Sequence, residues 1–299
     1  MNHWIAFTTY YVIALAIASA VMVHSGRRQK NHPASRRVIP EMFPWLDEQR
    51  TYANAVSIAR YSIARPPAWA IIVFASAPSV AALAVAPFGS NTAGFTAFAH
   101  RLAPWTGVDR RGALLTYATI VVVFIVGAIG YLRVARSAAP EEQPPLLRDR
   151  NSVQVWLRLA GGAFIDEGGA LEELGWRGWA LPVLVVTTGS SVWATALLAL
   201  LWWAWHFPRE VPALKRRKAP PNFVKNQAQF LWLCLMLSIL MTISWQYTGS
   251  VWPAVLIHGG TNVWSKAIGA PMWNRAKRDV RTDVVTVLAV IALGIELIR

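Results

Sequence analysis

Long runs of apolar residues, separated by polar stretches, recur along the whole chain. Eight of these runs approach or exceed the ~20 residues that an α-helix needs to cross a bilayer. A single strand cannot satisfy its backbone hydrogen bonds in lipid, so the runs predict helices. The pattern therefore predicts an all-α polytopic membrane protein, a bundle of about eight transmembrane helices. They occupy residues 4–24, 67–87, 113–132, 155–186, 191–207, 229–247, 251–270 and 282–298.

Composition agrees with this interpretation. Of 299 residues, 55% are hydrophobic and only 15% are charged, against roughly 25% charged residues in a typical soluble domain. The 16 tryptophans are typical of membrane-interface belts and helix packing. We expect one membrane domain spanning 1–299.

The net charge of +14 would favour nucleic-acid binding in a soluble chain. Here 22 of the 29 Lys and Arg residues fall in alternate loops between apolar runs, as is typical of cytoplasmic loops. We therefore expect membrane lipids and no nucleic acid as partners, and both termini outside, in a plasma (inner) membrane. The basic loops are 25–66, 133–153, 208–228 and 271–281, and the alternate loops 88–112, 187–190 and 248–250 carry three such residues in total.

Three segments need separate interpretation. Residues 4–24 lack a basic stretch before the apolar run, which favours a retained helix over a cleaved signal peptide. Residues 41–65 mix apolar and charged positions, which fits either an amphipathic helix at the interface or a solvated loop. Residues 137–150 form a polar, proline-containing linker.

Ionisable side chains within apolar segments are costly, at about 2.5–3.5 kcal/mol on insertion scales, and indicate function. Segment 155–186 contains Glu172, Glu173 and, four residues after Glu173, Arg177. That spacing places Glu173 and Arg177 on one helix face as an ion pair. Alone, such a pattern is usually a solvated ion-pair face.

Two other patterns place a polar side chain one helical turn from another residue. His206 follows Trp202 by four residues, and Asn262 follows His258 by four. A single histidine in an apolar helix is usually a packing residue, so neither pattern alone is specific.

Depth in the bundle connects these patterns. Glu172 and His206 each lie 17 residues from Gly189, the expected turn between two helices. At ~1.5 Å per residue both side chains would reach the same depth in an antiparallel pair. His258 lies nearer the start of its segment, so it reaches that depth only if the helix ends are staggered.

A carboxylate, two imidazoles and a carboxamide that meet in a wet site can hydrolyse an amide. Glu172 would take a proton from water, an imidazole would position that water, and Asn262 would stabilise an oxyanion. Alternatively, Glu172, His206 and His258 form a possible ligand set for a catalytic zinc. The residues alone leave both mechanisms open.

At these residues the sequence resembles the CPBP (CAAX-processing and bacteriocin-processing) family of intramembrane endopeptidases, which includes the type II CAAX prenyl endopeptidase. The resemblance covers about 153–266, a protease-like core, whereas 1–150 resembles no family that we can name. Three motifs of the family are present in the same order and spacing. They are E-E-x-x-x-R at Glu172, Glu173 and Arg177, F-x-x-x-H at Trp202 and His206, and H-x-x-x-N at His258 and Asn262.

The resemblance implies an eight-helix fold with a site open toward the cytosol. It implies that Glu172 activates water with help from His206, and that His258 and Asn262 stabilise the oxyanion. In an older view of the family, the same residues bind zinc and the enzyme is a metalloendopeptidase. The substrate would be a membrane-tethered peptide or lipidated protein, either CAAX-like or bacteriocin-like.

Other residues would support the site. The resemblance implies that Glu173 and Arg177 orient their helix, and Trp202 replaces the Phe that is usual in the second motif. Asp166 and Glu167 are outside the motifs. They either support the site or lie in the cytosolic half of one long helix, and we favour the second interpretation.

Two other functions are compatible with the sequence. In a non-catalytic membrane partner or immunity protein, the polar cluster would hold helices together through contacts of about 0.6 kcal/mol each. In a transporter or proton relay, the same groups would line a path through the membrane. The motif set favours the hydrolase.

Overall fold

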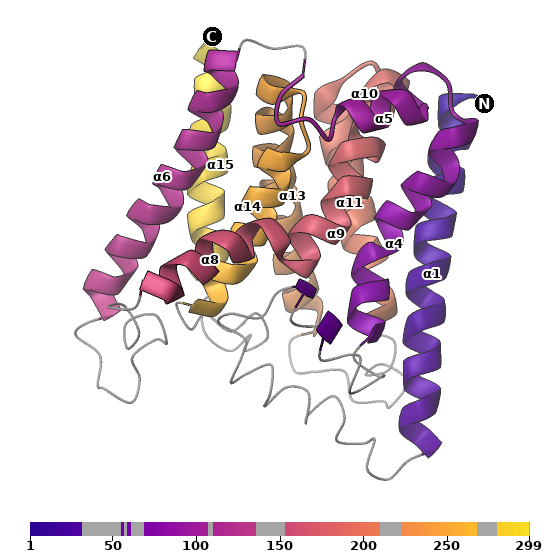
Figure 1. Ribbon diagram of the computed structural model, residues 1–299, viewed down its shortest axis with the longest axis horizontal. Helices are drawn as coiled ribbons and strands as arrows, with labels where there is room; N and C mark the ends of the chain where they lie inside the picture. Colours follow the sequence, from indigo (N-terminus) through magenta and orange to yellow (C-terminus); the bar gives the residue numbers. More distant parts are fainter. Residues whose placement is uncertain are drawn as a thin grey trace.

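The computed structural model describes residues 1–31, 55–56, 59–60, 69–106, 110–135, 153–209, 223–267 and 280–298. The regular elements within this part of the chain are helices, without a strand (Figure 1). The α-helices are α1 (His3–Asn31), α4 (Trp69–Val85), α5 (Phe95–His100), α6 (Arg110–Ala135), α8 (Val153–Ile165), α9 (Glu167–Gly175), α10 (Leu181–Thr188), α11 (Ser191–Trp205), α13 (Phe223–Thr248), α14 (Trp252–Ala267) and α15 (Val280–Ile298).

Four stretches of the described chain are long and apolar enough to cross a membrane. They confirm an all-α integral membrane protein. The predicted count of about eight crossings is not shown, partly because α11 and α14 contain only 15 and 16 residues. The four stretches are His3–His24, Trp69–Phe88, Arg110–Gly127 and Phe223–Thr248.

The prediction of one continuous helix over 155–186 is wrong. α8 ends at Ile165, and the extended backbone of Asp166 (φ −59°, ψ 139°) separates it from α9. The Asp166 carboxylate caps α9 by accepting hydrogen bonds from the N–H groups of Gly168 and Gly169, which stabilises a new helix start. A π-helical turn, η6 (Trp176–Ala180), then joins α9 to α10.

Two predictions concern segments that the structure largely leaves undescribed. The interfacial helix or solvated loop at 41–65 lies outside the described residues, apart from the pairs 55–56 and 59–60. The polar linker at 137–150 lies wholly outside them. Both remain predictions.

Glycines let the helices that carry the candidate residues pack closely. α14 packs against both α8 and α9, and α4 packs against α9. A Cβ atom on Gly169 of α9 would lie 2.7 Å from the Cα atom of Gly259 on α14. A Cβ atom on Gly175 would lie 2.3 Å from the carbonyl carbon of Pro78 on α4. Such contacts between small residues are typical of helix packing in membranes.

Aromatic side chains fill the space between α1, η6 and α11. The ring of Tyr10 lies 5.6 Å from that of Trp176 and 4.9 Å from that of Trp179, measured between centroids. Trp176 in turn meets Trp205 edge to face. All four side chains are fully buried, so this core fixes the position of the π-helical turn beside the candidate site.

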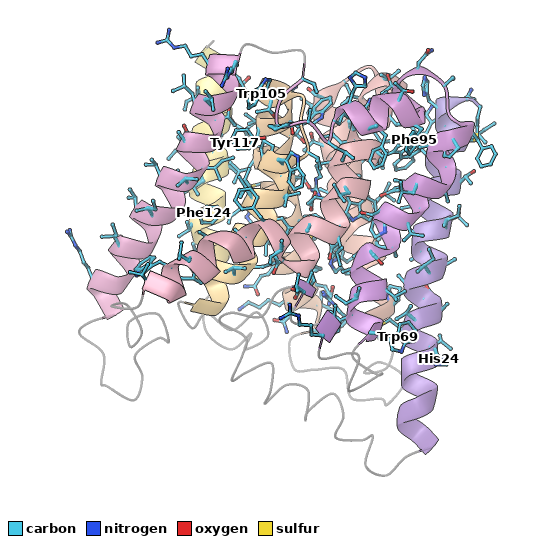
Figure 2. The ribbon with its side chains drawn as sticks, viewed as in Figure 1. His24, Trp69, Phe95, Trp105, Tyr117 and Phe124 are labelled. Carbon is cyan, nitrogen blue, oxygen red and sulfur yellow. The ribbon has the colours of Figure 1, made fainter. Side chains whose placement is uncertain are left out.

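The two chain termini lie at the same end of the bundle, and α1 and α6 both run from that end to the opposite one (Figure 1). Figure 2 shows Trp105 and Trp69 toward opposite ends, as is typical of interfacial tryptophans. Trp69 of α4 packs against His24 of α1, with ring centroids 6.1 Å apart.

Candidate active site

The candidate catalytic carboxylate belongs to the last turn of α9. Glu172 is buried, and its Oε2 atom accepts a hydrogen bond of 2.9 Å from the indole N–H of Trp202 on α11. Sequence reasoning placed Glu172 and His206 at one depth on antiparallel helices. In the structure Glu172 and His206 both contact Trp202, Glu172 through the indole N–H and His206 through the carbonyl oxygen and the ring.

A buried ion pair lies directly beside Glu172. The Nη1 atom of Arg177 lies 2.9 Å from both carboxylate oxygens of Glu173, and both side chains are completely buried. Arg177 also donates a 2.7 Å hydrogen bond from Nη2 to Oγ of Ser238 on α13. The pair therefore joins α9, η6 and α13, as the four-residue spacing predicts for Glu173 and Arg177.

His206 follows the C-terminal end of α11. Its Nδ1 atom lies 2.8 Å from the carbonyl oxygen of Trp202. A carbonyl oxygen only accepts, so Nδ1 carries the proton and a neutral ring keeps its lone pair on Nε2. The rings of Trp205 and Phe230 meet the imidazole edge to face at 4.8 and 5.0 Å, which fixes its orientation.

His258 comes from α14 and reaches the same cluster. Its Nδ1 atom lies 2.7 Å from Oε1 of Glu173, and its ring meets that of Trp202 edge to face at 5.1 Å. The helices are thus staggered enough to bring His258 level with Glu172. Because a carboxylate only accepts, Nδ1 of His258 also carries a proton, and its Nε2 atom points away from Glu173.

Asp166 corrects an expectation from the sequence. It does not lie on a long helix away from the site: its carboxylate is fully buried and accepts a 2.8 Å hydrogen bond from Nδ2 of Asn262. Asp166 therefore holds the carboxamide of α14 and caps α9 at once. Since a carboxylate only accepts, this contact also fixes which end of the Asn262 amide is nitrogen.

Gly168 keeps side-chain atoms away from the two candidate donors. A Cβ atom at this position would lie 2.9 Å from Nδ2 of Asn262 and 3.0 Å from Nε2 of His258. Both distances are shorter than those of ordinary contacts between carbon and nitrogen atoms. Any side chain at residue 168 would therefore press against both nitrogens.

Sequence reasoning missed Gly168 and Ser238, and it gave the supporting role of Asp166 only as the less favoured of two alternatives. Asp166 and Gly168 belong to the string Asp-Glu-Gly-Gly, and an Asp before glycines in an apolar run is a usable signal for a helix break and cap. Ser238 is one of two serines in an apolar helix, a pattern without a specific signal.

Zinc binding by Glu172, His206 and His258 stays a prediction. Among the described residues, no group of three or more His, Cys, Asp or Glu side chains is arranged to hold a metal ion. The zinc ligand set of Glu172, His206 and His258 therefore has no support in the geometry.

Comparison with known proteins points to one family. Residues 153–264 match the Rce1-like family, described as type II CAAX prenyl endopeptidase Rce1-like. The matched segment contains Asp166, Gly168, Glu172, Glu173, Arg177, Trp202, His206, Ser238, His258 and Asn262. No curated protein matches the chain. The match over residues 153–264 supports a CPBP family intramembrane protease, similar in this segment to the type II CAAX prenyl endopeptidases.

Proposed function

We propose that this protein hydrolyses a peptide bond of a membrane-tethered substrate, with water activated by Glu172. The substrate is a CAAX-like lipidated tail or a bacteriocin-like precursor. One observation carries the proposal: Glu172, His206 and His258, from different parts of the chain, all contact the side chain or backbone of Trp202. A buried carboxylate beside two imidazoles is a set of groups that can move a proton and bind an oxyanion.

Glu172 acts as the general base. Oε2 is bound to the Trp202 indole, which leaves Oε1 to take a proton from water. His206 presents the lone pair of Nε2 and orients that water by accepting its second hydrogen. Glu172 takes one proton, and the water oxygen forms a bond with the carbonyl carbon of the substrate.

The carbonyl electron pair then resides on oxygen as an oxyanion. The second N–H of the Asn262 amide and a protonated Nε2 of His258 stabilise it. When the intermediate collapses, the C=O bond re-forms, the C–N bond breaks and Glu172 returns its proton to the leaving amine. Water is thereby consumed and an acid and an amine are formed.

The net charge of the two glutamates, Arg177, His258 and the substrate does not change while water attacks. Ionised Glu172 and Glu173 offset Arg177 and a protonated His258, and proton transfer to Glu172 coincides with formation of the oxyanion. In a poorly solvated site, a reaction that creates no net charge avoids a large desolvation cost.

We further propose that both termini lie outside the plasma membrane and the basic loops in the cytoplasm, with about eight crossings in total. Both termini lie at the same end of the bundle (Figure 1), which supports an even number of crossings. α10 lies at the same end of the bundle as the two termini (Figure 1). α11 begins just after α10 and runs for 15 residues, and His206 follows its last residue. His206 is therefore near the opposite, cytoplasmic end.

The test is cleavage by purified protein in proteoliposomes. Three substrates are compared by mass spectrometry: a farnesylated peptide with a CAAX tail, a bacteriocin-like precursor, and the first peptide without its lipid. The proposal predicts cleavage of a tethered substrate, loss of cleavage in Glu172→Ala, and retention in Asp283→Asn, which removes a carboxylate on α15. Cleavage by Glu172→Ala at the wild-type rate would contradict it, and so would wild-type protein that cleaves none of the three substrates, which would favour a non-catalytic or transport role.

A further inference from the structure

Trp202 contacts four residues of the candidate site, each through a different portion of the residue. Its indole N–H lies 2.9 Å from Oε2 of Glu172, and its carbonyl oxygen lies 2.8 Å from Nδ1 of His206. The edge-to-face contact with His258 spans 5.1 Å between ring centroids, and the Arg177 guanidinium carbon lies 4.4 Å above the indole. The side chain is 2% exposed.

We propose that Trp202 is a positioning residue for hydrolysis, whose indole N–H holds one oxygen of Glu172 so that the other faces the attacking water. The inference rests on the function proposed above and adds to it a residue outside the proton-transfer step. An indole nitrogen only donates, so it pairs with the carboxylate without competing for the proton that Glu172 takes from water.

The indole is itself held in place. Arg177 stacks on its face and is fixed by Glu173 and by Ser238. A cation over an indole face is the strongest form of cation–π contact. The chain of contacts from Ser238 through Arg177 and Trp202 to Glu172 therefore connects α13, η6, α11 and α9.

Glutamate needs such a restraint more than a shorter side chain would. Its carboxylate is carried by three rotatable bonds, and a misplacement of about 1 Å can cost roughly 100-fold in rate. A buried indole N–H that loses its acceptor also carries a desolvation penalty. The desolvation penalty keeps Glu172 and Trp202 paired, and the pairing keeps the carboxylate in the position that the reaction needs.

The conservative substitution isolates the N–H group. Trp202→Phe, which introduces the residue usual in the F-x-x-x-H motif, keeps an aromatic ring for Arg177 and His258 but removes the donor to Glu172. Trp203→Phe is the matched control: it removes an indole N–H from the same helix, for which the described part of the chain provides no acceptor.

The experiment compares kcat, KM and the midpoint of thermal unfolding for wild type, both variants and Glu172→Ala, with the cleaved tethered substrate. For Trp202→Phe we expect kcat to fall about 10- to 100-fold with KM within about twofold of wild type. Trp203→Phe should retain wild-type kcat. An unfolding midpoint close to wild type in both variants separates positioning from a structural role.

Three outcomes would overturn the inference. One is a wild-type kcat for Trp202→Phe while Glu172→Ala is inactive, in which case the proposed function stands without it. Another is a rise in KM alone, which would assign Trp202 to substrate binding, and the third is an equal loss of kcat in both tryptophan variants. If Glu172→Ala cleaves like wild type, the proposed function fails and this inference with it.

Discussion

The Nδ1 atom of His258 on α14 lies 2.7 Å from Oε1 of Glu173 on α9, and the same carboxylate binds Arg177. One buried anion thus serves two basic groups from different elements. Glu172, the neighbouring residue, instead receives a neutral indole N–H. Adjacent glutamates therefore have different partners: Glu173 joins two basic groups, and in the proposed function Glu172 takes the proton from water.

This division predicts that two isosteric substitutions lower the thermal unfolding midpoint by very different amounts. Glu173→Gln leaves Arg177 buried without its anion, and breaking a buried pair costs about 3–5 kcal/mol. Its thermal unfolding midpoint in detergent should fall by about 10 °C or more. Glu172→Gln should move the midpoint by less than about 3 °C. Equal midpoints for the two variants would contradict the division.

Gly168 should tolerate no side chain. In Gly168→Ala, the Cβ atom would lie 2.9 Å from Nδ2 of Asn262 and 3.0 Å from Nε2 of His258, so both donors would have to move. We expect kcat to fall about 100-fold or more. Gly161→Ala on α8 is the control, because nothing lies within 4 Å of its added Cβ atom. Similar activities of the two alanine variants would show that hydrolysis does not depend on the positions of these two donors.

Asp166 should support both stability and activity. Asp166→Ala removes the cap of α9, which costs about 0.5–2 kcal/mol, and also releases Asn262. Ser190→Ala removes a comparable cap from α11, where Ser190 Oγ accepts from the N–H of Trp193, yet leaves the site intact. Unfolding and cleavage assays should show stability losses in both variants but a loss of kcat in Asp166→Ala alone. A wild-type kcat for Asp166→Ala would show that Asn262 needs no such partner.

Metal removal distinguishes the two hydrolytic mechanisms. Because no three described His, Cys, Asp or Glu side chains form a ligand set, we expect protein dialysed against a strong chelator to keep its cleavage rate. The measurement is kcat before and after dialysis, with metal analysis of the same samples. Loss of activity that returns when zinc is added would support the zinc mechanism instead.

Sequence reasoning found the groups but not all of their contacts. The four-residue spacing of Glu173 and Arg177 predicts their ion pair, because helical geometry alone brings the side chains together. The contact between Trp202 and Glu172 depends on how two distant helices are rotated against each other, which spacing does not report.

The break at Asp166 was missed for a different reason. The apolar run continues across it, and hydrophobic length predicts a span without showing where its helix stops and starts again. The cap by Asp166 and its bond to Asn262 on α14 combine a local signal with a contact 96 residues away. The sequence contains the signal for the cap, whereas the contact with Asn262 can be found only from the three-dimensional structure.

The cleavage rate of Glu172→Gln tests the central claim most directly. The amide has the shape of the carboxylate and can still accept the hydrogen bond from Trp202, but it cannot take a proton from water. With a tethered substrate in proteoliposomes, we predict that kcat falls at least about 1,000-fold while the unfolding midpoint remains near that of wild type. A correctly folded Glu172→Gln variant that cleaves at the wild-type rate would contradict the claim.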